Sequence, residues 1–302
     1  MNNTMNNTMN NTIFQDETLH RDETTKWGQP CAVERTNVLG TGVHAVNMKQ
    51  TIALMRQAIE EDRKEYICLA GAHGIMEAHR NPDLKHIAAN AFLVLPDGMP
   101  TVWFGRLRGL SKMDRVFGPD LMVEILGCRE LSHLTHFFCG GAPGVAERLR
   151  DEMMRRFPAV CICGTFTPPF RPMTTEEELG LVEQIRQLQP DISWVGLSTP
   201  KQERFMFHYL PMLQTKLMVG VGAAFLFHTG AIQDSPAWLK RAGLQWLHRL
   251  LQEPSRLWQR YLINVPLFLF HSVLQLSGLR SYPILSGSPA SHQSPRTAPL
   301  PK

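Results

Sequence analysis

The sequence predicts an α/β fold: a Rossmann-like, mostly parallel sheet with helices on both faces, followed by a C-terminal helical appendage. Over residues 37–236, short apolar runs alternate with longer segments of helical periodicity, which is typical of β-α-β units. Glycine-rich turns follow several of the apolar runs, as they do at the carboxyl ends of parallel strands. The composition, 43% hydrophobic and 19% charged over 302 residues, suits a large buried core.

Charge, cysteine spacing and hydropathy argue against several other classes of protein. A formal net charge of +4 is too weak to indicate a nucleic-acid partner. The six cysteines are scattered and form no Cys-x-x-Cys pair, so we expect neither a metal site nor a disulfide framework. We find no signal peptide and no run of about 20 apolar residues, and we therefore expect a cytoplasmic protein.

The composition divides the chain into four segments. Residues 1–36 begin with three Met-Asn-Asn-Thr repeats and are predicted to be disordered. Residues 37–236 form the α/β domain, and residues 237–276 form a basic appendage rich in Trp and Leu. Residues 277–302 are predicted to be a disordered tail, in which Pro, Ser and Gln dominate from Ser286 onward.

In the first half of the α/β domain, apolar runs predict strands at residues 37–39, 66–70 and 92–95. Helical spacing of apolar residues predicts helices at residues 44–62 and 75–79, and Asn81-Pro82 ends the second. Glycine-containing turns are expected at residues 40–42 and 71–74.

The second half of the domain is more regular. Strands are predicted at residues 133–139, 160–165, 192–196 and 217–221. Helices are predicted at residues 121–129, 143–157, 174–188 and from about 202 to 213. Strands that alternate with helices pair in parallel, and such sheets bind ligands beyond the carboxyl ends of their strands. We therefore expect the functional site at that edge of the sheet.

Asp97 is the first candidate for chemistry. It lies in a turn with Pro96, Gly98 and Pro100, directly after the strand at 92–95. A carboxylate between two apolar segments needs a partner or a function. In the simpler interpretation, the side chain caps its own backbone in an Asx-turn. In the other, Asp97 is a catalytic base at the end of a strand.

The turn after the strand at 133–139 is a candidate anion site. Gly140, Gly141 and Gly144 would let a backbone approach a phosphate, and Pro143 suits the first position of a helix whose N-terminus attracts anions. The turn lacks the full Gly-x-Gly-x-x-Gly fingerprint, so it is equally well interpreted as a plain strand-to-helix turn.

A second polar loop, Gly196–Glu203, follows the strand at 192–196. Lys201 can meet a phosphate, and Gln202 can exchange hydrogen bonds with sugar hydroxyls. We include Pro200 and Glu203 among the candidate binding residues. The alternative is a surface helix start, with Thr199 as the cap and Pro200 in the first turn.

Three isolated polar residues complete the candidates in the domain. Arg115 can neutralise a diphosphate through its planar fork. Asp120 is predicted to cap the helix at 121–129. His73, in the turn at 71–74, is either a catalytic or sugar-contacting group or a hydrogen-bonded loop residue.

The appendage combines tryptophans, leucines and arginines. At about 100° per residue, Arg241, Arg249, Arg256 and Arg260 share one sector of a helix, although Pro254 is expected to divide the segment into two helices. Two interpretations stay open. The appendage is either a membrane-surface patch with its arginines on anionic groups, or a pair of packing helices with the tryptophans in the core.

Taken together, six ordered blocks resemble the WecG/TagA/CpsF family, glycosyltransferase family 26, over residues 38–261. The blocks are Leu-Pro-Asp-Gly-Met-Pro (95–100), Arg-Val-Phe-Gly-Pro-Asp-Leu-Met (115–122), Gly-Gly-Ala-Pro-Gly-Val-Ala-Glu (140–147), Gly-Leu-Ser-Thr-Pro-Lys-Gln-Glu (196–203), Gly-Val-Gly-Ala-Ala-Phe (220–225) and Arg-Ala-Gly-Leu-Gln-Trp-Leu-His-Arg-Leu-Leu-Gln-Glu-Pro (241–254).

The resemblance implies an inverting, metal-independent glycosyltransferase that needs no cofactor. Such enzymes move a sugar, N-acetylmannosamine or a related hexose, from a UDP-sugar to a polyprenyl-diphosphate-linked saccharide. They serve the synthesis of exopolysaccharide, teichoic acid or common antigen at the bacterial cell envelope.

Carried over residue by residue, the resemblance gives Asp97 the role of general base. It places Arg115 near the donor diphosphate and Gln202 on the donor sugar. It also implies that the appendage from Trp238 docks peripherally on the inner face of the cell membrane, with its arginines near the acceptor diphosphate.

The chain departs from the family pattern at two places. Many members have a Thr and an Asn in the loop where this chain has Ala70, Gly71 and His73, and Leu226 stands where an Asp is common. These departures leave open a catalytically silent protein that binds a nucleotide sugar. A Rossmann oxidoreductase is disfavoured because no acidic residue follows a complete glycine fingerprint. The donor sugar, acceptor, linkage and oligomeric state, a homo-oligomer included, stay open.

Overall fold

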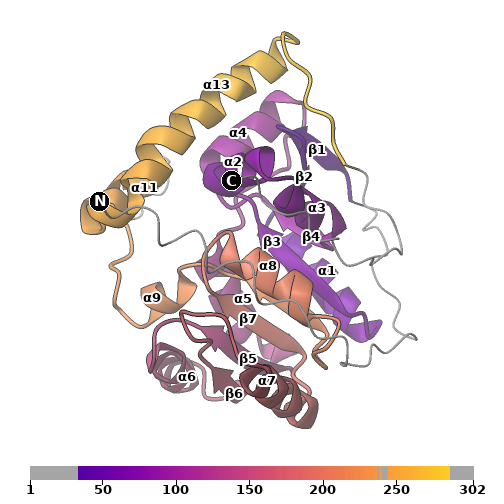
Figure 1. The fold of residues 1–302 in the computed structure, drawn as a ribbon, viewed down its shortest axis with the longest axis vertical. Helices are drawn as coiled ribbons and strands as arrows, with labels where there is room; N and C mark the ends of the chain where they lie inside the picture. Colours follow the sequence, from indigo (N-terminus) through magenta and orange to yellow (C-terminus); the bar gives the residue numbers. More distant parts are fainter. Residues whose placement is uncertain (1–32, 237, 240–243, 286–302) are drawn as a thin grey trace.

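The computed structural model describes residues 33–236, 238–239 and 244–285 (Figure 1). Its centre is a six-stranded parallel sheet with the strand order β4-β3-β8-β7-β5-β6. The strands are β3 (Glu65–Leu69), β4 (Leu93–Leu95), β5 (Thr135–Gly140), β6 (Cys161–Phe166), β7 (Ile192–Gly196) and β8 (Leu217–Gly220). The predicted α/β fold with a mostly parallel sheet is confirmed.

Helices cover both faces of this sheet. They are α1 (Met48–Glu60), α2 (Ala72–Arg80), α3 (Pro82–Asn90), α4 (Met99–Leu107), α5 (Gly118–Leu126), α6 (Val145–Arg156), α7 (Thr175–Leu188), α8 (Lys201–Tyr209) and α9 (Ala224–His228), with a 3-10 turn η1 (Arg129–Leu131). Local sequence fixes several starts. The side chains of Asn47 and Thr174, for example, form capping boxes at α1 and α7.

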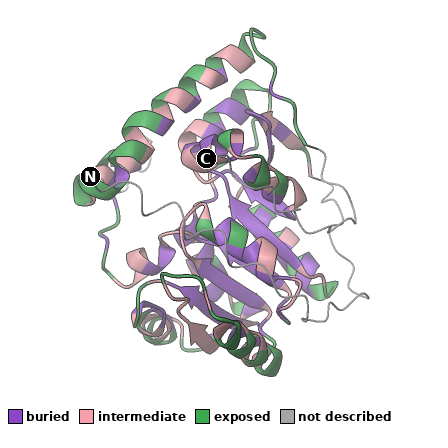
Figure 2. Cartoon of the chain, in the orientation of Figure 1, coloured by how far each residue is buried: buried purple, intermediate pink, exposed green. Residues whose placement is uncertain are grey.

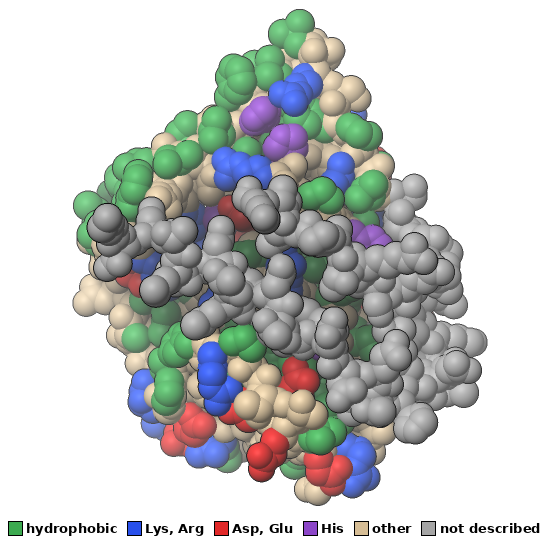
Figure 3. All heavy atoms as spheres, in the orientation of Figure 1, with side chains coloured by type: hydrophobic (Ala, Val, Ile, Leu, Met, Phe, Trp, Pro, Cys, Tyr) green, Lys and Arg blue, Asp and Glu red, His purple; other side chains and the backbone are tan. Residues whose placement is uncertain are grey.

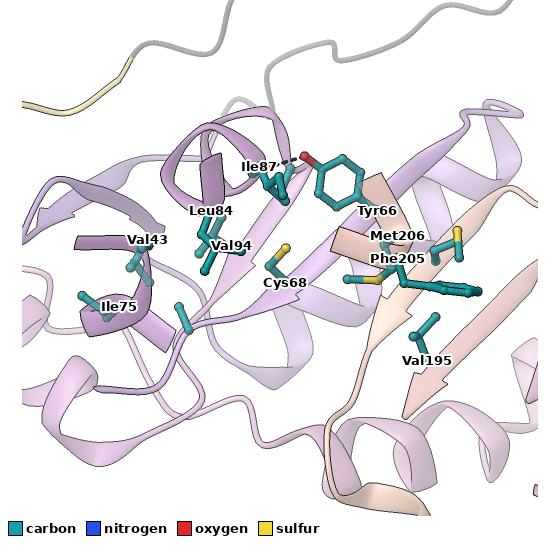
Figure 4. Packing of buried hydrophobic residues seen from close by; sticks show 14 of the residues in the cluster. Val43, Tyr66, Cys68, Ile75, Leu84, Ile87, Val94, Val195, Phe205 and Met206 are labelled. Atoms are coloured by element: carbon teal, nitrogen blue, oxygen red, sulfur yellow. Dashed lines mark hydrogen bonds between the residues drawn. The ribbon is translucent and has the colours of Figure 1, made fainter. Parts of the chain in front are cut away.

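The two faces of the sheet bury separate hydrophobic clusters. Phe137 belongs to one cluster and its neighbour Phe138 to the other, because side chains along a strand alternate between faces. In the first cluster, α2, α3 and α8 contribute Ile75, Leu84 and Met206 (Figure 4). Figure 2 shows the inner strands of the sheet almost entirely buried, as expected for a sheet covered on both sides, whereas the edge strand β6 is only partly buried.

The N-terminal part of the domain differs from prediction. We expected a single strand at 37–39 and a loop after it, whereas β1 (Arg35–Val38) and β2 (Thr41–His44) form an antiparallel hairpin. Leu39 and Gly40 both have positive φ, which matches the twist of a two-residue hairpin turn. The buried His44 ring accepts the Val94 N–H at 2.9 Å and so satisfies a backbone donor of the edge strand β4.

Two helix starts also differ from prediction. α2 begins at Ala72, so His73 lies in the first turn of a helix and not in a loop. α6 begins at Val145, and Gly144, with φ +80°, is its N-cap, so Pro143 lies outside the helix. The left-handed conformation of Gly144 prevents the helix from extending backward to Pro143.

The described part of the appendage consists of four consecutive helical segments. These are α11 (Gln245–Gln252), α12 (Pro254–Trp258), the π-helix η2 (Gln259–Ile263) and α13 (Asn264–Leu276). Pro254 separates α11 from α12, as predicted. None of the helices in the described residues combines the length and hydropathy that a membrane span requires.

α13 packs on α2 and crosses the end of the domain (Figure 1). It buries Asn264, Phe268 and Ser272, which are four residues apart and therefore lie on one face. At its far end, Gln275 bonds the N-terminal hairpin twice: its Oε1 accepts the Leu39 N–H, and its Nε2 donates to the Asn37 carbonyl, both at 2.9 Å.

The residues after α13 are not all disordered, contrary to the prediction of a tail from residue 277. Tyr282 is buried, and its carbonyl accepts a hydrogen bond from Asn37 Nδ2 at 2.7 Å. Its ring packs against His271 and His79, which accounts for the ordered path. Of the segment predicted to be disordered at 1–36, Arg35 and Thr36 belong to β1, which is a further departure from the prediction. Residues 1–32 and 286–302 lie outside the described residues.

Candidate active site

Asp97 follows β4 at the carboxyl edge of the sheet. The backbone beside it is fixed, because the Val116 N–H donates to the Pro96 carbonyl at 2.9 Å. α4 begins after Gly98 with no side-chain capping bond, so the Asx-turn interpretation finds no support. Asp97 Oδ1 is buried and has no hydrogen-bond partner among the described residues. A buried, unpaired carboxylate oxygen calls for a ligand or a reaction to explain it.

The surroundings of Asp97 act on its pKa in opposite directions. Burial raises the pKa above its ordinary value, because desolvation disfavours the charged form. Arg260, Arg115 and the Gly118 N–H oppose this shift, and Asp120 adds a smaller upward effect. The net shift is upward, so the carboxylate is a stronger base than an exposed Asp while two cations still favour its ionised form.

Arg115 is brought near Asp97 by the backbone contact at Val116. Its Nη1 donates to Oε1 of Gln245 at 2.6 Å, and its guanidinium lies 4.8 Å from the Phe117 ring centroid. Its Nη2 is 3.7 Å from Oδ2 of Asp120. The prediction that Asp120 caps the helix is wrong, because α5 already begins at Gly118 and has no side-chain cap.

A pocket of about 420 Å³ lies between the domain and the appendage. Asp97 and Arg115 are not among the residues that line it, and Arg260 is the lining residue that acts on the Asp97 carboxylate. The pocket's charged and polar lining comes from α2, the loop before α8, and the appendage: His73, Glu77, Arg80, Ser198, Thr199, Arg256, Gln259, Arg260 and Asn264. The sequence analysis proposed His73, Arg256 and Arg260 as separate candidates, and the fold brings these three residues to one pocket.

His73 is held as a neutral ring. Its Nδ1 lies 2.8 Å from the Asn264 Nδ2. The Oδ1 of the same Asn264 amide accepts a hydrogen bond from Arg80 Nη1 at 2.8 Å. Burial lowers the pKa of His73 to about 4, and the charges of Arg260 and Arg80 add to the effect. A neutral Nδ1 can accept the Asn264 N–H, so this histidine joins α2 to α13.

The amide of Gln202 is engaged within the protein. Its Oε1 accepts the Gly222 N–H at 2.9 Å, and its Nε2 donates to Oε1 of Glu203 at 3.0 Å. Glu203 is buried and also accepts the Thr199 hydroxyl at 2.9 Å, while its Oε2 has no partner among the described residues. Burial raises the pKa of Glu203. These bonds tie the loop after β7 to the end of β8.

The start of α8 differs from the expected helix cap. Pro200 is the N-cap, and no side chain caps the helix, so Thr199 does not have the predicted capping role. The Thr199 hydroxyl reaches Glu203 instead. Lys201, the first residue of α8, is exposed and open to a ligand from solvent.

Two positions of the turn after β5 leave no room for a side chain. A Cβ at Gly140, where φ is +134°, would lie 2.7 Å from the Gly196 carbonyl oxygen, and a Cβ at Gly141, where φ is +78°, would lie 2.8 Å from the Val145 Cβ. Pro143 is exposed beside the N-terminus of α6. Four strand spacings separate this turn from Asp97, or about 19 Å, so only a ligand of that length could touch both.

The arginines of the appendage do not share one face. Arg260, in η2, is half-buried and acts on the pKa values of Asp97, His73 and Glu203. Arg249 is buried 4.8 Å from the Phe227 ring centroid and pairs with Glu253 at 2.9 Å. Arg256 is exposed and pairs with the same Glu253 at 2.6 Å. Arg241 lies outside the described residues. The break at Pro254 and the π-helix turn rotate these positions apart.

Several residues of the site were missed by sequence reasoning, among them Arg80, Gln245 and Asn264. Gln245 contacts Arg115 and Asn264 contacts His73, across 130 and 191 residues of sequence. No local pattern signals such contacts. In the described ranges, no group of three or more His, Cys, Asp or Glu side chains is arranged to hold a metal ion.

Comparison with known proteins gives a consistent match. The Glycosyl transferase WecG/TagA/CpsF family matches residues 36–282. Three relatives are each named N-acetylglucosaminyldiphosphoundecaprenol N-acetyl-beta-D-mannosaminyltransferase. The Bacillus spizizenii relative is 27% identical over 69% of this chain and 78% of its own. The Bacillus subtilis relative is 25% identical over 63% and 71%, and one from Staphylococcus aureus is 23% identical over 78% and 93%.

Proposed function

Since the chain belongs to the WecG/TagA/CpsF family and is a glycosyltransferase, we propose that it transfers N-acetylmannosamine or a related hexose from a UDP-sugar to a polyprenyl-diphosphate-linked saccharide. The names of the relatives support a lipid-linked acceptor and this class of sugar. The product would serve a cell-surface polysaccharide. Within this chain, one observation supports the proposal most directly. The Asp97 Oδ1 at the carboxyl edge of the sheet is buried and has no hydrogen-bond partner among the described residues.

In the proposed reaction, Asp97 is the general base. A hydroxyl of the acceptor sugar attacks the anomeric carbon of the donor, and its proton passes to the Asp97 carboxylate as the new C–O bond forms. The bond from the anomeric carbon to the diphosphate oxygen breaks on the opposite side, so the configuration inverts and UDP leaves. A positioned base contributes about 10²–10⁴-fold to such a step.

Cationic side chains would bind the leaving diphosphate. Arg115 lies beside Asp97, and Arg260 is close enough to act on its carboxylate, so both can stabilise charge that develops near the reacting atoms. Lys201 is exposed at the start of α8 and can add a third cation. We propose that these fixed charges let the reaction proceed without a metal ion or cofactor.

We further propose that the appendage docks on the inner face of the cell membrane. The side of α13 opposite Phe268 exposes Leu269, Phe270 and Val273, with exposed fractions of 46%, 59% and 63%. Figure 3 shows hydrophobic side chains gathered along this edge of the molecule. An apolar helix face beside a pocket lined by arginines suits an acceptor whose lipid stays in the bilayer and whose diphosphate stands at its surface.

A donor screen tests the proposed activity. The full-length protein is incubated with a panel of UDP-sugars and a synthetic polyprenyl-diphosphate N-acetylglucosamine, and products are detected by mass. We expect one added N-acetylhexosamine or hexose unit. If a UDP-sugar binds with ordinary affinity and no donor yields product, the chain is a silent nucleotide-sugar-binding protein and the proposed transfer is wrong.

A further inference from the structure

The contact between Arg115 and Gln245 joins the domain to the appendage at the proposed diphosphate site. Gln245 is the first residue of α11 and is 8% exposed, so its amide is almost fully removed from solvent. Its Oε1 accepts the Arg115 Nη1–H at 2.6 Å. This is shorter than the 3.7 Å between Arg115 Nη2 and Asp120, and the shorter, hydrogen-bonded contact does more to fix the guanidinium.

The hydrogen-bonding partner of Arg115 is a neutral amide, and the Asp120 carboxylate forms only a longer ion pair with Arg115 at 3.7 Å. An amide oxygen fixes the direction of a guanidinium without cancelling its charge, whereas a carboxylate at the same distance would form an ion pair. Arg115 therefore stays available to an anionic ligand while Gln245 and the ring of Phe117 restrict its movement.

The same region has hydrogen-bond donors that lack acceptors. Nε2 of Gln245 and Nε of Arg249 are buried and have no partner among the described residues. Arg249 is 8% exposed and lies one helical turn after Gln245 on α11. Buried donors are normally satisfied, so two unpaired donors one turn apart on α11, one of them on the residue that holds Arg115, indicate a ligand with acceptor oxygens at this end of the helix.

We propose that Gln245 is a positioning residue for the nucleotide diphosphate: it holds Arg115 in the orientation that binds the phosphoryl oxygens. This inference rests on the proposed function, because it takes the anion to be the diphosphate of a UDP-sugar. It assigns α11 a role in donor binding that is distinct from the proposed contact of α13 with the membrane.

The test compares Gln245→Leu with the wild-type chain by calorimetric binding of UDP and of uridine, which lacks the diphosphate. We expect Gln245→Leu to weaken UDP binding by about tenfold or more, the scale of a lost hydrogen bond to a charged group. Uridine affinity should change by less than about twofold. With a UDP-sugar donor, KM should rise by a similar factor to the loss of UDP affinity.

Two further variants separate positioning from damage to the helix. Gln245→Glu keeps an acceptor for Arg115 but pairs its charge, so we expect weaker UDP binding than in the wild type with uridine binding unchanged. Gln252→Leu is the matched control, seven residues along the same helix, where the amide bonds Gln233 and not Arg115. We expect that control to bind UDP like the wild type, and melting curves show whether each variant is folded.

The outcomes differ for the inference and for the proposed function. If the wild-type chain binds UDP and Gln245→Leu binds it with the same affinity, the inference alone is overturned. Equal losses for UDP and uridine also overturn it, because they would show a general loss of structure. A wild-type chain that binds neither UDP nor any UDP-sugar overturns the proposed function and the inference together.

Discussion

Asp97→Asn is the sharpest test of the proposed chemistry. The replacement keeps the size of the side chain and removes its ability to take a proton. The loss of a general base is expected to lower kcat by about 10²–10⁴-fold, or roughly 2.7–5.5 kcal/mol in the barrier. Binding of the UDP-sugar should survive, because the donor contacts proposed for Arg115 and Arg260 are untouched.

The structure also predicts how this substitution affects stability. Burial raises the pKa of Asp97, which means that folding disfavours its ionised form. A neutral amide avoids this desolvation, so the free energy of unfolding should not fall. This separates Asp97→Asn from variants that lose activity because they unfold.

The assay measures product by mass spectrometry at saturating donor and acceptor, with UDP-sugar affinity measured by calorimetry. Asp83→Asn serves as the matched control, because Asp83 is exposed on α3 and only 3.9 Å from Arg204 in a surface ion pair. A kcat for Asp97→Asn within tenfold of the wild type would refute the role of this carboxylate. So would a loss of activity that is fully explained by lost donor binding.

Three further predictions concern stability and the membrane. The pKa values of His44, His73 and His136 are lowered to about 3, about 4 and about 4, so from pH 6.5 down to about 4 the unfolded chain binds protons that the folded chain does not. Stability measured by urea unfolding should therefore fall by roughly 3–4 kcal/mol per pH unit below pH 6, and an unchanged stability at pH 5 would contradict this. Gly140→Ala should lower stability by more than about 1 kcal/mol, because the left-handed φ and the Gly196 carbonyl leave no room for a Cβ, whereas Gly180→Ala, in open space, should not destabilise. Phe270→Asp with Val273→Asp should abolish flotation with anionic liposomes while melting stays unchanged, since both side chains are exposed; flotation equal to wild type would exclude this face as the docking surface.

Much of the fold could be predicted because its signals are local. Most strands of the sheet are short apolar runs buried on both faces, with the edge strand β6 as the exception. Helix starts such as that at Thr174 are set by a cap within the same turn. Asp97 was placed at the end of a strand by the same reasoning. β2 was missed because Thr41 and Gly42 resemble a loop in sequence, although the hairpin turn at Leu39 and Gly40 makes them a strand.

The arrangement of the site could be predicted only in part, because its contacts are long-range. Arg260 reaches the surroundings of Asp97 only because η2 turns the chain after α12. The partners Gln245 and Asn264 come from the appendage and have no periodic or motif signal. The helical projection that placed four arginines in one sector applies only to a continuous helix, and the predicted break at Pro254 together with η2 separates these positions.

The attachment of α13 at both ends sets a fixed geometry for substrate delivery. Asn264 bonds α2 at one end of this helix, and Gln275 bonds the hairpin at the other. If α13 docks on a bilayer as proposed, this attachment would set the height of the reaction centre above the lipid headgroups. It would thereby also set the length of saccharide that can reach Asp97. An acceptor with extra sugars between its diphosphate and its terminal hydroxyl would carry that hydroxyl past the base, so this helix would act as a molecular ruler for acceptor length.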